Sequence, residues 1–349
     1  MKLSRDELKT LMKNKLMQAG LHEDHAEQTA EVLTWSHERG YASHGAVRVE
    51  YYSERIAKGG ITVDPQFTWT QTGPSCGIFD GDNGVGYVVA IEGMKKAIEL
   101  AKENGIGVVG MANMSHSGSI GYYNEMAAKE GLVAITFCQS DPMAVPYGGT
   151  EPYYGTHPIS FAAPTADDRM VVFDMATTVQ AWGKILDRRS KGESIPDTWA
   201  VDERGVPVTD PHQVNALVPI AGAKGYGLMM LVDVFSGVLL GVPFGGHVTS
   251  MYHDLSEGRC LGQMSIVMDP DRFIGKDAFN QRMSQMLDEL GAIPPAPGHD
   301  KVYYPGERAE IRRQRNEENG IEVVDELVEY LKGDAVHFDR YDHKNRFAD

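Results

Sequence analysis

Apolar side chains recur every three or four residues through the first sixty positions, a spacing that predicts helices. The first helix begins at Ser4, which forms the sequence pattern of a capping box with Glu7, and it ends at Gly20. The same spacing predicts two further helices, at about 23–38 and 44–58. The chain therefore begins with a block of three helices.

From residue 77 onward, short apolar runs alternate with helical patterns. Strands are predicted at 77–80, 107–112 and 132–138, and helices at about 87–103 and 120–129. Chain rich in Pro and Gly follows to about residue 219, and then come an apolar helix, a strand at 265–268 and helices in the C-terminal third. This alternation of strand and helix predicts an α/β layer.

The longest apolar run, 225–242, is interrupted only by Asp233 and Ser236. Eighteen residues can just cross a bilayer. We expect a buried core helix instead, because the run is rich in glycine and the chain around it is acidic.

Composition narrows the set of partners and the compartment. The chain carries 33 basic and 49 acidic side chains, and its net charge of −16 argues against nucleic acid and anionic membranes as partners. Its three cysteines are odd in number and widely spaced, which argues against a disulfide framework and a cysteine-based zinc site. The N-terminus lacks the apolar segment of a signal peptide. We therefore expect a cytoplasmic protein.

Residues 105–110 spell G-x-G-x-x-G, the dinucleotide-binding fingerprint. In that fingerprint the glycines follow a strand and open a helix, where free N–H groups meet a pyrophosphate. Here they follow a predicted helix and form a predicted strand, so we interpret the match as accidental.

Two histidines lie where chemistry is expected. His44 and Arg48 share one face of the third predicted helix with Tyr52 beside them, and Ser43 is a plausible N-cap, which together predict an anion site. A solvated basic helix face is the alternative. His116 directly follows the strand at 107–112, at the end of the sheet where ligands bind, and can exchange protons near neutral pH. A loop histidine bonded to backbone is the alternative.

Lys224 stands among glycines at the start of the apolar helix, a pattern that is typical of a phosphate site. A flexible turn with a solvated lysine is the alternative. The histidines at 212, 247 and 253 lack the spacing of metal ligands, so no metal site is predicted. A G-x-S-x-G elbow and a Walker A loop are absent as well, which argues against hydrolase and kinase functions.

Several longer stretches together resemble the type-2 malate/L-lactate dehydrogenase family, whose members use NAD(P). They are GYASHGAVRVEYYSERI, MSHSGSIGYY, YYGTHPISFAAP, VFDMATTVQAWGK, GAKGYGLMMLVDVFSGVLLG and VYYPGER. The resemblance implies an α/β (α+β), non-Rossmann fold with an α/β cofactor-binding domain at 75–270. It also implies a helical domain built from both chain ends, 1–74 with 271–349.

The resemblance implies NAD as cofactor, a small-molecule 2-hydroxy acid as substrate, and a homodimer with active sites near the subunit interface. By the family's motifs, His116 is the catalytic base, and the substrate side is lined by Ser43, His44, Arg48 and Tyr52. The motifs that hold the cofactor fall on Ser140, Asp174, Met175, Ala176, Lys224, Gly306, Glu307 and Arg308. An acidic Asp174 near an adenosine ribose would favour NAD over NADP.

Within this family, the stretches QSDPM, SIPDTWAVDERGVPVTDP and AIPPAPG are similar to those of members that oxidise (S)-ureidoglycolate to oxalurate in allantoin breakdown. Malate, L-lactate, sulfolactate or diketogulonate-type acids are the alternative substrates. A non-catalytic module that binds a carboxylate or a nucleotide is the alternative from another class. Two histidines and a cationic helix face exceed what binding requires, which favours the enzyme.

Overall fold

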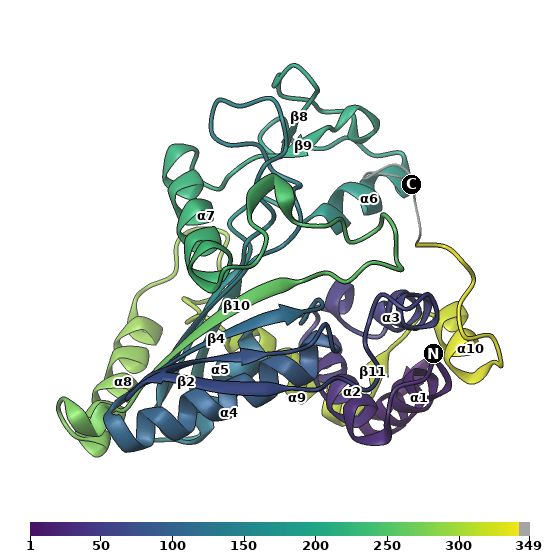
Figure 1. The fold of residues 1–349 in the computed structure, drawn as a ribbon. Helices are drawn as coiled ribbons and strands as arrows, with labels where there is room; N and C mark the ends of the chain where they lie inside the picture. Colours follow the sequence, from purple (N-terminus) through teal and green to yellow (C-terminus); the bar gives the residue numbers. More distant parts are fainter. Residues whose placement is uncertain (342–349) are drawn as a thin grey trace.

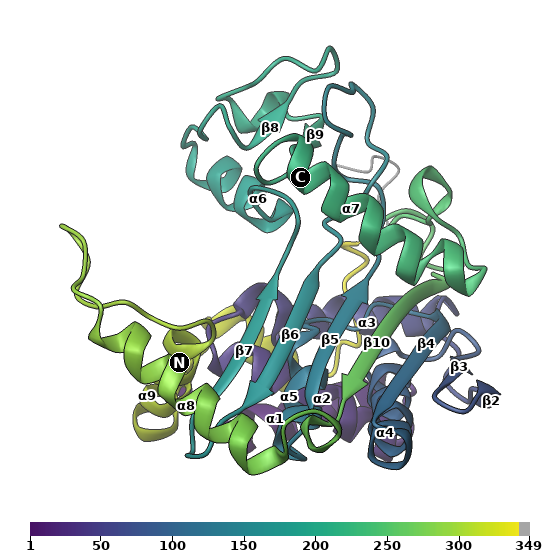
Figure 2. The same ribbon diagram turned by 90° about the vertical axis from the view of Figure 1, so that its left-hand side faces the viewer.

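A seven-stranded sheet forms the centre of the protein, of which the computed structural model describes residues 1–341. Its strand order is β2-β3-β4-β10-β5-β6-β7, and neighbouring strands run antiparallel except β3 and β4 (Figure 2). The strands are β2 (Thr68–Gly73), β3 (Cys76–Asp80), β4 (Ile106–Met114), β5 (Val133–Cys138), β6 (Ile159–Pro164), β7 (Met170–Met175) and β10 (Leu261–Met268).

Helices cover both faces of the sheet (Figure 1). α4 (Gly86–Asn104) and α5 (Gly121–Lys129) pack on one face, whereas α7 (Ala223–Ser236) packs across β5 and β10 on the other. α8 (Lys276–Ala292) contacts β6. His116 lies in the loop between β4 and α5, two residues after the end of β4.

The two ends of the chain lie together beside this sheet. β1 (Lys2–Leu3) pairs with β11 (Ile321–Glu322), and α1 (Arg5–Gln18) contacts α10 (Asp325–Lys332). α2 (Glu23–Glu38) packs against α1 and against α9 (Glu307–Asn319). The domain limits 1–74 with 271–349, and 75–270, stay a prediction, and residues 342–349 lie outside the described part.

A separate lobe rises above the sheet in Figure 1 and has its own hydrophobic core. It contains α6 (Trp182–Lys191) and the two-stranded pair β8 (Ala200–Val201) and β9 (Ala216–Leu217). Trp182, Ile185 and Leu217 are buried in its core together with Met229 of α7. α7 therefore joins this lobe to the sheet. Short 3-10 turns lie at Pro211–Gln213, Val238–Leu240, Gly245–His247 and Pro270–Arg272.

Most predicted elements are confirmed. The capping box of Ser4 and Glu7 is present, α2 has the predicted bounds, and the G-x-G-x-x-G segment forms β4 after the left-handed Gly105. The Pro/Gly-rich stretch hid more structure than expected, since it contains α6 and the elements β6, β7, β8 and β9. β2 was also missed, since no strand was predicted between the third helix and residue 77.

The prediction for the third helix is wrong at its start. A 3-10 turn at Ala42–His44 comes first, and α3 (Arg48–Ala57) begins four residues after His44. The helical conformation is interrupted at Gly45, where an added Cβ would lie 2.7 Å from the ring of His37. His37 Nδ1 also accepts a hydrogen bond from Ala46 N at 3.2 Å, which fixes the break. Ser43 is consequently not the N-cap of α3.

The prediction of a buried core helix is wrong for the outer face of α7. Met229 and Val232 are buried, but Met230, Leu231 and Val234 are exposed. Among residues 1–341, Ala223–Leu240 is the one helical segment long and apolar enough to cross a membrane, and 33% of it is buried.

Candidate active site

Ser43, His44 and Arg48 come together where the 3-10 turn leads into α3. Arg48 Nε donates to the backbone oxygen of Ser43 at 2.7 Å, and Ser43 Oγ lies 3.1 Å from His44 Nδ1. Arg48 Nη1 also donates to Tyr252 Oη at 2.8 Å. These two partners of Arg48 are neutral, and it has no ion pair with a carboxylate within residues 1–341. A buried or half-buried guanidinium in this state attracts an anion.

His116 lies opposite this cluster, with Tyr52 between it and the core. The hydroxyl of Tyr52 is 2.6 Å from His116 Nδ1, and the rings of His44 and His116 stack with centroids 5.9 Å apart. His116 Nε2 has no hydrogen-bond partner in the described chain, so this nitrogen is available to a ligand. Tyr52 is fully buried, and its hydroxyl contacts His116 and Tyr87.

Electrostatics keep both histidines neutral at physiological pH. Burial lowers the pKa of His116 well below its ordinary value, and the positive charges of Arg48 and Arg259 add to that effect, as does His44. Burial and then Arg48 lower the pKa of His44 to about 4. His44 lies in the 3-10 turn before α3 and not on that helix.

Sequence reasoning missed a second guanidinium near this cluster. Arg259 is buried beside Asp141, with Nη2 donating to the carboxylate at 3.1 Å. Asp141 also accepts from Met251 N at 3.0 Å. Asp141 belongs to the QSDPM stretch, but Arg259 follows it by more than a hundred residues, and no local pattern links them. Tyr252, the partner of Arg48, was missed for the same reason.

Hydrogen bonds around the end of β7 connect Ser140, the chain after β7 and the chain before α7. Ser140 Oγ lies 3.2 Å from Thr156 Oγ1, and Thr177 N donates to Thr156 O at 2.8 Å. Ile220 N then donates to Thr177 O at 2.9 Å, which brings the start of α7 to this place. Met175 and Ala176 precede Thr177 directly. Four segments that are distant in sequence therefore meet here.

A buried histidine, His157, connects Ser140 to α7 through contacts on both of its ring nitrogens. His157 Nδ1 accepts from Ser140 N at 3.3 Å, and its Nε2 lies 3.4 Å from a carboxylate oxygen of Asp233. Asp233 belongs to α7 and also accepts from Gly245 N at 2.9 Å. Ser140 is thus held by the helix that carries Lys224 at its N-terminus.

The α7 N-terminus is open. Lys224 is exposed, no side chain caps the helix, and an added Cβ at Gly225 would lie 1.8 Å from Ile220 O. Uncapped N–H groups beside a lysine suit a phosphate. The start of α9 lies against β7, where an added Cβ on Gly306 would lie 2.6 Å from Val172 O.

Three of the expected cofactor residues already have partners. Asp174 accepts from Gly121 N at the start of α5 at 2.8 Å, and burial raises its pKa to about 6. Glu307 pairs with Lys301, and Arg308 lies 4.3 Å from the centre of the Tyr303 ring. The Asp174 carboxylate therefore binds the helix that follows the His116 loop, and its expected position against a ribose stays untested.

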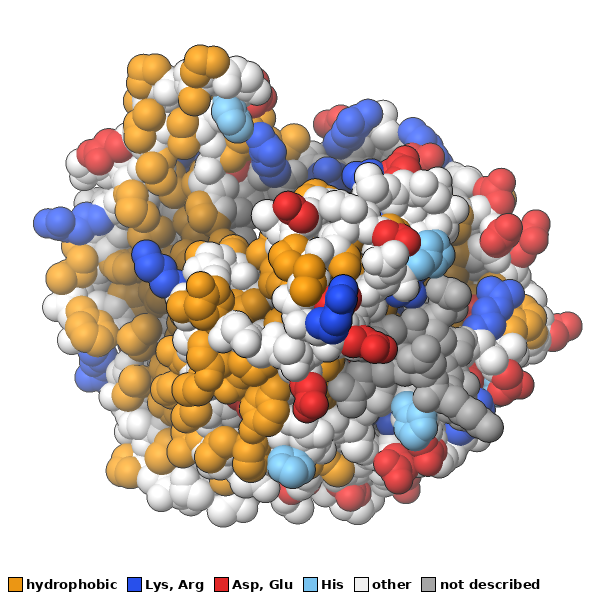
Figure 3. Space-filling view, turned by 90° about the horizontal axis from the view of Figure 1, so that it is seen from above, with side chains coloured by type: hydrophobic (Ala, Val, Ile, Leu, Met, Phe, Trp, Pro, Cys, Tyr) orange, Lys and Arg blue, Asp and Glu red, His pale blue; other side chains and the backbone are white. Residues whose placement is uncertain are grey.

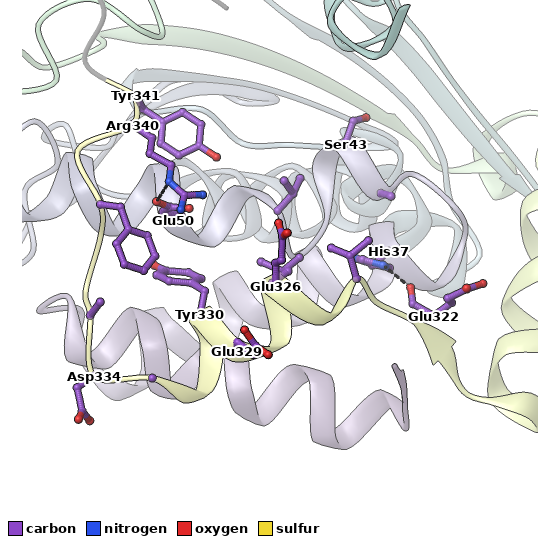
Figure 4. A pocket seen from close by; sticks show the side chains of 17 residues that line it. His37, Ser43, Glu50, Glu322, Glu326, Glu329, Tyr330, Asp334, Arg340 and Tyr341 are labelled. Carbon is purple, nitrogen blue, oxygen red and sulfur yellow. Dashed lines mark hydrogen bonds and ion pairs between the residues drawn. The ribbon is translucent and has the colours of Figure 1, made fainter. Parts of the chain in front are cut away.

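A cavity of about 820 Å³ lies elsewhere, between α3 and the C-terminal segment (Figure 4). Ser43 lines it, but the other residues around His116 do not. Its wall includes acidic side chains, of which Glu50 pairs with Arg340 at 3.6 Å. In the described chain, no group of three or more His, Cys, Asp or Glu side chains could hold a metal ion.

Comparisons with known proteins give the chain's relatives. The sequence model of the malate/L-lactate dehydrogenase family matches residues 3–332. Ureidoglycolate dehydrogenase (NAD(+)) of Escherichia coli strain K12 is 55% identical over 348 residues, covering 100% of both chains. Malate dehydrogenase of Pyrococcus horikoshii is 34% identical over 95% of this chain and 93% of its own. Sulfolactate dehydrogenase of Methanocaldococcus jannaschii has a similar structure, with a TM-score of 0.89, 33% identity and coverage of 95% and 96%.

Proposed function

Because the chain belongs to the malate/L-lactate dehydrogenase family, we propose that this NAD-dependent enzyme oxidises (S)-ureidoglycolate to oxalurate. One observation carries the choice of substrate: identity is 55% to a ureidoglycolate dehydrogenase but 34% to the malate enzyme of Pyrococcus horikoshii. The cluster around His116 supports the chemistry. Malate, L-lactate, sulfolactate and diketogulonate-type acids are the competing substrates.

The substrate would bind with its carboxylate on Arg48, whose planar fork suits a carboxylate and whose charge has no carboxylate partner in the described part of the chain. His116 Nε2 would take the proton of the substrate hydroxyl while a hydride leaves the same carbon, so that a C=O bond forms. Two electrons pass with the hydride, and the proton stays on the imidazole until solvent removes it. Neutral His44 would donate or accept one hydrogen bond beside it.

NAD, when bound, supplies the hydride acceptor. The residues present fit such a group, because the uncapped N-terminus of α7 and exposed Lys224 suit a pyrophosphate. The remaining contacts would come from Ser140, from the 174–176 segment after β7, and from the 306–308 turn. His157 and Asp233 would hold Ser140 in register with α7.

The outer face of α7 supports a homodimer as part of this proposal. Hydrophobic side chains gather on the left-hand side of Figure 3, the side on which α7 lies in Figure 1. Val238 and Leu239 after the helix are 52% and 62% exposed, which extends the apolar face. A contiguous apolar patch is unfavourable in water and is typical of an interface. Light scattering at micromolar concentration should show a dimer, and Leu231→Glu should weaken it. We also propose a cytoplasmic location.

The deciding experiment follows absorbance at 340 nm with a panel of 2-hydroxy acids, each supplied with NAD and with NADP. We expect the highest kcat/KM with (S)-ureidoglycolate and NAD, and oxalurate as the product by mass spectrometry. His116→Ala is the matched control for background oxidation. A higher kcat/KM for another acid, or for NADP, would contradict the proposal. A protein that binds NADH but turns over no acid would be a binding module instead.

A further inference from the structure

A hydrogen-bonded chain of aromatic side chains supports His116 from the core. Tyr52 Oη lies 2.6 Å from His116 Nδ1 and 2.9 Å from Tyr87 Oη. Both tyrosines are completely buried. Tyr52 comes from α3, Tyr87 from the first turn of α4, and His116 from the loop after β4. Three elements therefore converge on the hydroxyl of Tyr52.

The Tyr52 hydroxyl has one hydrogen and two neighbours that can accept it. If Tyr52 donates to His116 Nδ1, the neutral imidazole carries its own proton on Nε2 and cannot take another there. If Tyr52 donates to Tyr87 Oη, it accepts from Nδ1–H instead, and Nε2 keeps a free lone pair. Only the second arrangement lets His116 act as a base toward a ligand.

We propose that Tyr87 is a positioning residue that sets the tautomer of His116, by accepting the hydroxyl hydrogen of Tyr52. The inference rests on the proposed role of His116 as the base. The tyrosines need not ionise in this arrangement: burial raises the pKa of Tyr52 well above its ordinary value and raises that of Tyr87. The two tyrosine hydroxyls act only as donors and acceptors of hydrogen bonds and stay protonated.

The local packing keeps this arrangement in place. Gly86 N donates to Ser115 Oγ at 2.9 Å, and an added Cβ at Gly86 would lie 2.1 Å from Ser115 O, so the start of α4 touches the His116 loop. The rings of Tyr52 and Tyr87 meet edge to face with centroids 5.4 Å apart. Neither hydroxyl can therefore move far from its partner.

Tyr87→Phe should lower kcat although Tyr87 does not touch the substrate, because the substitution removes the acceptor for the hydroxyl hydrogen of Tyr52. The hydrogen of Tyr52 then has His116 Nδ1 as its remaining acceptor among residues 1–341, which favours the tautomer that cannot act as a base. We expect kcat to fall about tenfold, the scale of one hydrogen bond, with NADH affinity unchanged. Adding Tyr52→Phe removes the misdirected donor, so the double variant should match Tyr52→Phe alone and exceed Tyr87→Phe in kcat.

Nitrogen-15 NMR of histidine-labelled protein reads the tautomer directly, with the His116 signals assigned by their loss in His116→Ala. We expect a protonated Nδ1 in the wild type and a protonated Nε2 in Tyr87→Phe. Tyr330→Phe is the matched control, since this buried tyrosine donates to Val336 O at 2.7 Å and has no recorded contact with His116. A protonated Nε2 in the wild type would overturn the proposal even if Tyr87→Phe failed to fold.

An unchanged tautomer in a folded Tyr87→Phe protein would overturn it equally. The NMR measurement needs neither substrate nor NAD, so it is independent of which hydroxy acid the enzyme oxidises. If His116→Ala retained full activity, the proposed base would be wrong although the tautomer result stood. The two failures are therefore distinguishable.

Discussion

Around His116 the polar groups are already paired with one another, whereas on the cofactor side the exposed side chains reach into solvent. Tyr52 Oη lies 2.6 Å from His116 Nδ1, and Tyr252 Oη accepts from Arg48 at 2.8 Å. Lys224 and Arg308, by contrast, are exposed, and the contact described for Arg308 is with the ring of Tyr303. A preorganised group loses its geometry when one atom changes, while an exposed side chain can be replaced by a neighbour or by water. Substitutions around His116 should therefore cost more.

The largest effect is expected for His116→Ala. Loss of a general base lowers kcat by about 10²–10⁴-fold. Because burial and the neighbouring cations lower the pKa of His116, the base is neutral at pH 7, and activity should fall only as pH drops through that pKa. The low-pH limb of the kcat profile should vanish in the variant. NADH affinity, followed by fluorescence, should persist.

His44→Ala, measured alongside, tests which histidine is the base. Its ring stacks on His116, but its pKa of about 4 makes it the poorer proton acceptor. We expect a smaller loss of kcat and a retained low-pH limb. If His44→Ala alone abolished the limb, the two roles would be reversed.

Arg48→Lys should have the next largest effect, and on KM. A lysine keeps the charge but loses the bidentate fork, and hydrogen bonds to a charged group contribute about 1.5–3 kcal/mol, so KM should rise about 10- to 100-fold. A carboxylate bound at Arg48 also offsets the charge that lowers the pKa of His116. The low-pH limb of kcat should therefore lie at higher pH than that of kcat/KM in the wild type. An equal loss of NADH affinity would instead point to a role in folding.

Lys224→Ala should act more weakly, because this exposed lysine is one of several groups at an uncapped helix start. We expect the Kd for NADH to rise about tenfold at low salt, and less at high salt where the charge is screened. Lys95→Ala is the control, since Lys95 is a surface lysine of α4 paired with Glu92. If Lys224→Ala lowered kcat as much as His116→Ala does, the exposed side chains of the cofactor side would not be replaceable by neighbours or water.

The sequence could predict the site residues that follow local patterns, but not those that tertiary contacts bring together. His116 follows an apolar strand and Arg48 stands four residues after His44, so local patterns found them both. The start of α3 was mispredicted because it depends on His37 filling the space beside Gly45, a tertiary contact. The site also contains residues from distant segments, which no local sequence spacing predicts: Tyr87, Tyr252 and Arg259. The strands β6 and β7 were not predicted because they lie in a stretch rich in Pro and Gly, although α5 packs against both strands.

Asp174→Asn tests the group that connects the two regions, and its effect should be the smallest. Asp174 begins the predicted cofactor segment 174–176, and its carboxylate accepts from Gly121 N, five residues after His116. Burial raises its pKa from 3.8 to about 6, so between these values the folded protein holds a proton that the unfolded chain releases. Stability contributed by Asp174 should thus fall as pH rises through this window and stay level above it. Asparagine keeps an acceptor for Gly121 but does not titrate, so the Tm of the wild type minus that of the variant should decrease between pH 4 and pH 6. A difference that increased over this range would mean that the folded protein favours the ionised carboxylate, and Asp174 would then be free to meet a ribose hydroxyl as an anion.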